Sequence, residues 1–284
     1  MFLPIASTGR TATSYVAQAL NRVPGLVALH EGHLGNDSGP DVLPMVNLDN
    51  FHCFKSKDRA AVVVSSKRSR QILDDACTEH GGRLLIDVAY YNSVLLAEIL
   101  RQMPETHAAI IVRDCESFVR SATWFTGSDP MPVGWPDPAK PLDAREKFIS
   151  MGRIRPTGGV AAESWAEWGA VERNIWLWLE TNRLLCNTWE EFPDRVHFLD
   201  FRELVAEPTS VLARLLATIG CPLSVGEAAI LRESLETAHT RQNERHGGYQ
   251  LGSSDQWSAT QRQFLVDAQA EIEERIRSFS NVQR

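Results

Sequence analysis

The chain opens with the stretch Phe2-Leu3-Pro4-Ile5-Ala6-Ser7-Thr8-Gly9-Arg10-Thr11-Ala12-Thr13-Ser14, and residues 15–20 continue it with a helical pattern. An apolar strand that passes through a small, hydroxyl-rich turn into a helix leaves the first backbone N–H groups of that helix unpaired. The helix dipole adds positive potential at the same place. Arg10 supplies a permanent cation, and the neighbouring hydroxyls supply hydrogen-bond donors. Residues 9–14, called the cradle below, are therefore predicted to bind a phosphate-like anion.

Composition limits the classes of protein that this chain can represent. With 284 residues, 43% of them hydrophobic, it can bury a substantial core. A net charge of −7 argues against a nucleic-acid groove as the main surface. The five cysteines are far apart and include no C-x-x-C pair, so neither a zinc knuckle nor a disulfide framework is expected. We expect a cytoplasmic protein without a signal peptide, membrane span or nucleic-acid partner.

Apolar strands alternate with helical segments along the chain, which predicts an α/β fold with a parallel sheet covered on both faces. No repeat or linker divides the sequence, so residues 1–284 are expected to form a single domain. The Pro- and Gly-rich residues 126–159 are expected to form an irregular lid or substrate-facing insertion, and residues 31–50 a loop. The sheet is expected to have about five strands. They are predicted at residues 2–6, 26–30, 83–87, 108–112 and 196–199, and the helices at residues 67–79, 93–103, 116–125, 162–192, 208–219, 225–237 and 259–279.

The cradle differs from the phosphate-binding loop of nucleotide triphosphatases, G-x-x-x-x-G-K-[ST]. It has neither the lysine for the β- and γ-phosphates nor the hydroxyl that holds Mg²⁺. It resembles instead the 5′-phosphosulfate loop of sulfotransferases that use 3′-phosphoadenosine 5′-phosphosulfate (PAPS). In that loop a Lys or Arg precedes Ser/Thr, Gly and two further Ser/Thr residues. Here the loop reads Arg10-Thr11-Ala12-Thr13-Ser14, with Ala12 in place of the usual Gly.

A second segment resembles the 3′-phosphate motif of the same family. Arg113 follows the strand predicted at residues 108–112, and Ser121 lies eight positions later on the next helix. Strand end and helix are then expected to converge on one phosphate, with Arg113 making a forked contact and Ser121 donating from its hydroxyl. Cys115 stands where the family commonly has Pro.

Two weaker matches follow in the family's order. Residues 198–208 are similar to its Tyr-Glu-Asp-Leu turn, and Phe201 takes the position of an aromatic residue that borders adenine; core packing is the alternative role for this ring. Arg245, His246 and Gly247 are similar to the C-terminal loop that closes over the 3′-phosphate, although Arg245 could also be a solvated loop residue.

The resemblance covers nearly the whole chain and implies a P-loop-like sulfotransferase architecture with a preformed PAPS site and no metal. It implies in-line transfer of the sulfuryl group to a hydroxyl or amine of a small-molecule acceptor, with adenosine 3′,5′-bisphosphate (PAP) as the leaving product. Arg10 would stabilise charge on the bridging oxygen, and the rest of the cradle, Gly9 included, would hold the phosphosulfate.

The general base cannot be assigned from the family's usual residues. Many family members carry a Lys in the segment that resembles residues 84–91, with a His nearby, but here the segment contains neither. Glu31 is the best candidate because ligands of open α/β sheets bind at the carboxyl ends of the strands. His33 and His30 are the next candidates, followed by Asp87 as base or acceptor ligand. A metal site is not expected.

Two other functions remain open on the sequence. The first is a nucleotide-dependent kinase or NTPase, which the cradle alone would allow. The second is a sulfotransferase-like nucleotide-binding protein that has lost catalysis, suggested by Ala12 and by the missing Lys and His. The acceptor and the oligomeric state cannot be read from the sequence.

Overall fold

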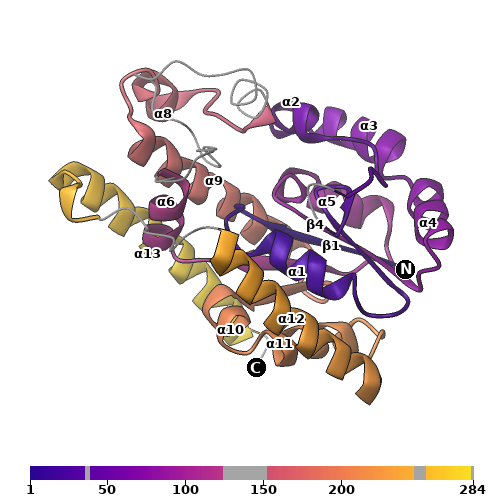
Figure 1. Ribbon diagram of the computed structural model, residues 1–284. Helices are drawn as coiled ribbons and strands as arrows, with labels where there is room; N and C mark the ends of the chain where they lie inside the picture. The colour runs from indigo at the N-terminus through magenta and orange to yellow at the C-terminus, as the bar shows by residue number, and fades with distance from the viewer. Residues whose placement is uncertain (36–38, 124–151, 246–253, 283–284) are drawn as a thin grey trace.

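The computed structural model describes residues 1–35, 39–123, 152–245 and 254–282. Within them one sheet, which lies near the centre of the molecule in Figure 1, has the strand order β3-β2-β4-β1-β5-β6. Five strands are mutually parallel, and the two-residue β3 pairs antiparallel with β2 at one edge. The five parallel strands are those predicted from sequence. The strands are β1 (Phe2–Ser7), β2 (Leu26–His30), β3 (His33–Leu34), β4 (Leu84–Ala89), β5 (Ala108–Val112) and β6 (Val196–Asp200).

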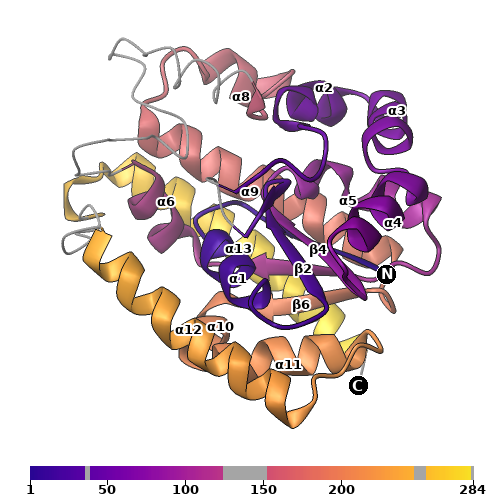
Figure 2. The same cartoon turned by 45° about the vertical axis from the view of Figure 1, so that its right-hand side comes forward.

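Helices cover both faces of the sheet, as the alternation of elements predicted. One face packs against α1, α11 and α12, and the other against the helices from α2 to α5 together with α9 (Figures 1 and 2). The helices are α1 (Thr13–Leu20), α2 (Asn50–Lys55), α3 (Lys57–Lys67), α4 (Arg70–Glu79), α5 (Asn92–Gln102), α6 (Cys115–Thr123), α8 (Gly159–Ser164), α9 (Ala170–Glu191), α10 (Phe201–Ala206), α11 (Pro208–Thr218), α12 (Val225–Arg245) and α13 (Ala259–Val282); η1 (Asn47–Asp49) and η2 (Ser254–Gln256) are single 3₁₀ turns.

The central strands are continuous apolar runs because both of their faces are buried. In β4, Leu84, Ile86 and Val88 pack under α1 and α12, whereas Leu85 and Ala89 point to the opposite layer. Asp87 lies on that second face and is the one charged residue of the strand. A carboxylate at such a position needs buried partners, which the candidate site supplies.

Several elements differ from the sequence-based expectations. Residues 31–50, expected as a loop, contain β3 and the turn η1. The expected helix at 67–79 starts later, because Ser69 caps α4 after the separate helix α3, whose own cap is Ser56. The helical pattern at 162–192 is two helices, α8 and α9. The insertion expected at 126–159 lies largely outside the described residues.

The tryptophan-rich helix α9 is part of the core. Trp178 is completely buried, and Trp176 and Trp189 are nearly so. The helix packs between α6, α13 and the sheet. The indole N–H of Trp178 donates to the carbonyl of Arg113 at 2.8 Å, so this core residue also fixes the backbone after β5.

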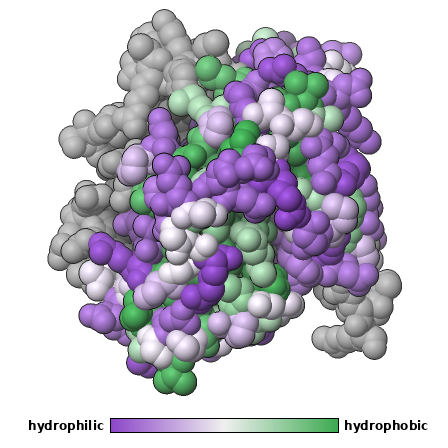
Figure 3. Space-filling view, turned by 90° about the vertical axis from the view of Figure 1, so that its right-hand side faces the viewer, coloured by the Kyte–Doolittle hydropathy of each residue, from purple (hydrophilic) through white to green (hydrophobic). Residues whose placement is uncertain are grey.

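On the face seen in Figure 3 hydrophilic side chains predominate and hydrophobic ones form small separate patches. All five cysteines are buried free thiols. Within the described part of the chain, no helix combines the length and the apolar character needed to cross a membrane.

The strand order determines where a ligand can bind. From β1 the chain goes first to β2 on one side, and after β4 it crosses to β5 on the other side of β1. At such a switch point the loops after neighbouring strands diverge and leave a crevice at their carboxyl ends. The cradle follows β1 directly, so it lies at this crevice.

Candidate functional site

The backbone of the cradle is held in a conformation that non-glycine residues rarely adopt. Gly9, Arg10 and Ala12 all have positive φ, at 79°, 54° and 60°. Ala12 is the N-cap of α1 and lacks a side chain that could cap the helix. The usual Ser, Thr, Asp or Asn cap is therefore missing at a helix start that follows a strand, which leaves this N-terminus suited to an external anion. Because its φ is positive, the backbone of Ala12 is strained and differs from that of a regular helix start.

The cradle and the predicted 3′-phosphate motif meet in space, although they are 111 residues apart. The Nε of Arg10 donates to the hydroxyl of Ser121 at 3.0 Å. The Nη1 of Arg113 donates to the carbonyl oxygen of Arg10 at 2.5 Å, and its Nε donates to the hydroxyl of Ser117 at 2.7 Å. The structure thus brings Arg10, Arg113 and Ser121 into one cluster.

Phe201 joins this cluster from the end of β6. The guanidinium of Arg113 lies over its ring, 4.8 Å from the centroid. Phe201 is the first residue of α10, whose start is fixed by Asp200 accepting from the N–H groups of Arg202 and Glu203. The ring is partly buried and also contacts the core under α1, so core packing is one of its roles.

The site concentrates positive charge away from water. Burial, followed by the charges of Arg113 and Arg153, lowers the pKa of Arg10 to about 10. Burial also lowers the pKa of Arg113. Both groups remain cations near neutral pH, but their charged forms are destabilised. An anion bound between them would relieve this cost.

The hydroxyls of the cradle differ in what they contact. Thr11 is completely buried, and its Oγ1 has no hydrogen-bond partner in the portion of the chain that is described. Thr13 shares a 3.0 Å hydrogen bond with Nε2 of His30, which ties α1 to the end of β2. Ser14 accepts from the amide of Gln18 at 2.9 Å.

Glu31 lies at the carboxyl end of β2, beside the ends of β4 and β1. Its φ of 53° and the φ of 86° at Gly32 form a left-handed turn. Its backbone N–H donates to the carbonyl of Val88, and its carboxylate accepts from the amide of Asn47 at 3.3 Å. Its charge also opposes the lowering of the pKa of Arg153 that burial causes. Glu31 is therefore electrostatically coupled to the cationic cluster.

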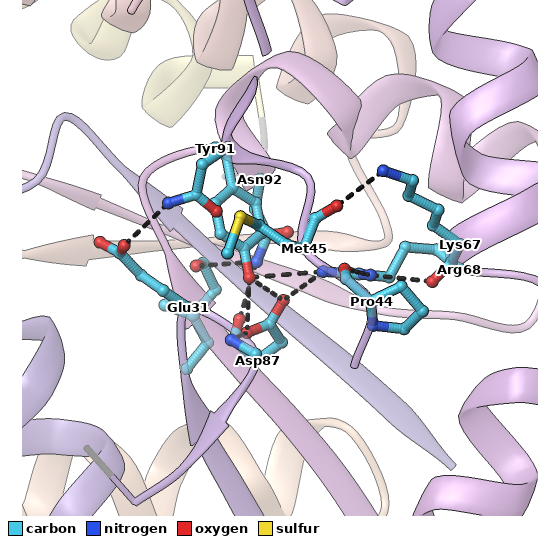
Figure 4. A network of polar contacts seen from close by, with 11 residues as sticks. Glu31, Pro44, Met45, Lys67, Arg68, Asp87, Tyr91 and Asn92 are labelled. Atoms are coloured by element: carbon cyan, nitrogen blue, oxygen red, sulfur yellow. Dashed lines mark hydrogen bonds and ion pairs between the residues drawn. The ribbon is translucent and has the colours of Figure 1, made fainter. Parts of the chain in front are cut away.

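A buried polar network supports the turn that carries Glu31 (Figure 4). The carboxylate of Asp87 accepts from the N–H of Gly32 at 3.1 Å and from the hydroxyl of Tyr91. Arg68, which is fully buried, lies 3.8 Å from the same carboxylate and donates to Tyr91 and to the carbonyl of Pro44. Burial raises the pKa of Asp87, and the charge of Arg68 opposes that rise. Asp87 thus supports the site instead of facing it.

Two other groups near the end of β4 are unsuited to act as bases. Burial raises the pKa of Tyr90 to about 12 and holds the pKa of Tyr91 well above its ordinary value. Both phenols therefore stay protonated near neutral pH. His33, the other predicted catalytic residue, forms a 2.7 Å pair with Asp41 at the edge of the sheet. Among these groups Glu31 best fits the role of base.

The fourth predicted motif gives no further information about the site. Arg245 is the last residue of α12 instead of a loop residue, and its side chain is outside the described part. His246 and Gly247 also lie outside the described residues. For the residues that are described, no group of three or more His, Cys, Asp or Glu side chains has the arrangement of a metal site.

Three residues of the site were missed in the sequence. Asp114 caps the start of α6 by accepting from the backbone N–H and the hydroxyl of Ser117, three residues later. The spacing of these two residues in Asp114-Cys115-Glu116-Ser117 is typical of a helix N-cap and could have indicated this contact. Asn47 and Arg153 come from irregular segments, where no periodicity indicates which side chains turn inward. Only the tertiary fold brings these two to the end of β4.

A similar fold is found among solved structures. The sequence matches no protein-family model and no curated protein. The fold is similar to a sulfotransferase domain from the curacin biosynthetic pathway, with a TM-score of 0.50, 14% identity, and coverage of 94% of this chain and 96% of that one. The chain therefore has the sulfotransferase fold.

Further similar structures are also sulfotransferases. A mouse sulfotransferase complexed with PAP gives a TM-score of 0.43 at 13% identity, covering 94% of this chain and 82% of that chain. A Mycobacterium avium sulfotransferase gives a TM-score of 0.43 at 11% identity, covering 88% and 78% of the two chains.

The strain at Ala12 leads to a stability prediction. Ala12→Gly should raise the free energy of unfolding by about 0.5–1 kcal/mol, because glycine adopts positive φ without the steric cost that a Cβ incurs. Urea unfolding of the two proteins measures this difference. The matched control is Ala217→Gly on the exposed face of α11, which should lower stability by a similar amount. Equal losses in both variants would contradict strain at Ala12.

The Asp87 network leads to a pH-dependent prediction. Arg68→Met should destabilise the protein by about 3–5 kcal/mol near neutral pH, because it leaves a buried carboxylate without its cation. Since the pKa of Asp87 is already raised in the folded state and should rise further, protonation at lower pH favours folding. The stability deficit relative to wild type, measured by urea unfolding, should be smaller at pH 5 than at pH 8.

The double variant Arg68→Met/Asp87→Asn is the control for this network. It removes the lone charge and keeps an oxygen for the N–H of Gly32, so it should recover more than half of the lost stability. A deficit that is the same at both pH values and in the double variant would show that Arg68 acts through packing alone.

Proposed function

We propose that this protein is a sulfotransferase that moves the sulfuryl group of PAPS to a hydroxyl or amine of a small-molecule acceptor. The observation that carries the proposal is the convergence of Arg10, Arg113 and Ser121 at the uncapped start of α1. Two cationic side chains and a helix N-terminus at one crevice match a ligand with two separate anionic groups. The sulfotransferase fold supports the same reading.

The residues present fit such a nucleotide. The buried Oγ1 of Thr11 lacks a partner in the described structure and would be satisfied by a phosphate oxygen. The lowered pKa values of Arg10 and Arg113 indicate charge that a bound anion would stabilise. Residues 9–14 would hold the 5′-phosphosulfate, Arg113 and Ser121 the 3′-phosphate, and Phe201 would border the base.

When bound, PAPS supplies an activated sulfuryl group with PAP as its leaving product. Arg10 would stabilise negative charge at the bridging oxygen, because its guanidinium is fixed by the bond to Ser121. Glu31 would accept the proton of the acceptor hydroxyl or amine at its carboxylate, which Asn47 and the turn at Gly32 hold in position. The five buried thiols suit a reducing compartment, and we place the reaction in the cytoplasm.

The alternatives differ in what they require. A kinase or NTPase would need a substitute for the lysine that the cradle lacks. An inactive nucleotide-binding relative would need only the anion site, and it is favoured by the strained Ala12 and by the missing Lys and His in residues 84–91. Nucleotide binding together with sulfate transfer separates the three functions.

Binding of PAP is the first test, measured by isothermal titration calorimetry. Wild type should bind PAP with micromolar affinity. Arg113→Ala should weaken binding about 10- to 100-fold, because hydrogen bonds to charged groups contribute about 1.5–3 kcal/mol. The matched control is Arg232→Ala, which removes an exposed arginine on α12 and should leave the affinity unchanged.

Transfer of labelled sulfate to a broad acceptor panel is the second test, and Glu31→Gln should reduce it strongly while PAP affinity stays near that of wild type. PAP affinity that is the same in Arg113→Ala and wild type would refute the site. PAP binding without sulfate transfer would favour the inactive nucleotide-binding relative. Mg²⁺-dependent ATP turnover would favour the kinase or NTPase.

A further inference from the structure

Arg153 is a buried cation that the roles above leave unassigned. Its side chain is 4% exposed, and its Nε–H has no hydrogen-bond partner among the described residues. Burial lowers its pKa, as it does for the other arginines of the site. A desolvated guanidinium donor without a partner is costly unless a ligand provides one. Arg153 is therefore a candidate for a direct ligand contact.

Packing holds Arg153 in one place. A Cβ on Gly152 would lie 2.0 Å from the carbonyl oxygen of Asn47, so only glycine allows the backbone to approach η1 this closely. Ile154 on the other side is 2% exposed. The guanidinium lies over the ring of Tyr90, 5.5 Å from the centroid. Its position is thus fixed before any ligand binds.

The position is between the cradle and Glu31. Arg153 lines a small pocket with Ser7 and Thr8, the residues that lead from β1 into the cradle, and with Tyr90 after β4. The buried Oδ1 of Asn50 in the same pocket also lacks a partner in the described structure. Arg153 is close enough to Arg10 for its charge to lower the pKa of Arg10. The charge of Glu31 opposes the lowering of the pKa of Arg153 that burial causes.

We propose that Arg153 contacts the sulfuryl group as it is transferred, on the side of the site that carries Glu31. The inference rests on the proposed function. In the step, the acceptor oxygen or nitrogen forms a bond to sulfur while the bond from sulfur to the bridging oxygen breaks. The bridging oxygen keeps the electron pair and remains on the 5′-phosphate of PAP. The acceptor proton passes to the carboxylate of Glu31.

Arginine suits this contact for two reasons. Its planar fork of N–H donors matches two oxygens of a sulfuryl group, and it remains charged in a buried site. A cation that is already fixed where negative charge is redistributed stabilises the transition state without having to reorganise. Removing one such donor lowers kcat by about 10²–10³-fold.

The test compares Arg153→Met with Arg155→Met. Arg155 is an exposed neighbour in the same segment that stacks on Phe51 at 4.0 Å, so it controls for loss of an aromatic-stacked arginine. PAP affinity is measured by calorimetry. Thermal unfolding of each protein saturated with PAP is then followed as inorganic sulfate is added, since sulfate imitates the group that PAP lacks. A neutral salt at matched ionic strength corrects for non-specific effects.

Arg153→Met should keep its PAP affinity within about threefold of wild type, need at least about tenfold more sulfate for the same thermal shift, and lose about 10²–10³-fold in kcat. Arg153→Lys should be intermediate, because it keeps the charge without the fork. Arg155→Met should behave as wild type.

Two results would overturn the inference while leaving the proposed function intact. One is an unchanged sulfate response and kcat in Arg153→Met. The other is a loss of PAP affinity as large as the loss in kcat, which would assign Arg153 a general structural or electrostatic role. Failure of the wild type to bind PAP would instead refute the proposed function. If Arg153→Met does not fold, Arg153→Lys supplies the same comparison.

Discussion

The burial of several guanidinium groups near one another is the constraint around which the carboxyl edge of the sheet is organised. Burial and the charges of Arg113 and Arg153 together lower the pKa of Arg10. Like charges in a medium of low polarity are costly, and a protein keeps them together only where surrounding structure holds them in place. The cost is largest in the ligand-free protein and falls when an anion binds. This arrangement suits the anionic ligand proposed above, at the expense of stability.

The scaffold shows how each cation is held. Trp178 in the core helix α9 fixes the carbonyl of Arg113, and Phe201 covers its guanidinium. Arg10 is fixed by Ser121. The contact of Gly152 with Asn47 and the ring of Tyr90 position Arg153. Core packing and charge placement are thus coupled, because the same residues serve both.

The parts of the fold that follow local rules could be predicted from the sequence. The five parallel strands are continuous apolar runs, and the cradle and the Arg113 motif lie at strand ends, where hydrophobic periodicity stops at a recognisable place. Asn47 and Arg153 could not be found in this way, because they lie in irregular segments and reach the site only through tertiary packing. The left-handed backbone of Ala12 could not be predicted from the sequence either. That deviation depends on how β1 and α1 are joined, which local propensity does not describe.

The central claim is that the cradle and the Arg113 motif form one site for the two phosphates of PAP. A crystal structure of the protein with PAP tests this most directly. The 5′-phosphate should lie on the backbone N–H groups of residues 10–14 and on the hydroxyl of Thr11. The 3′-phosphate should lie within hydrogen-bonding distance of Arg113 and Ser121. Either phosphate bound elsewhere, with Arg10, Arg113 and Ser121 keeping their present partners, would contradict it.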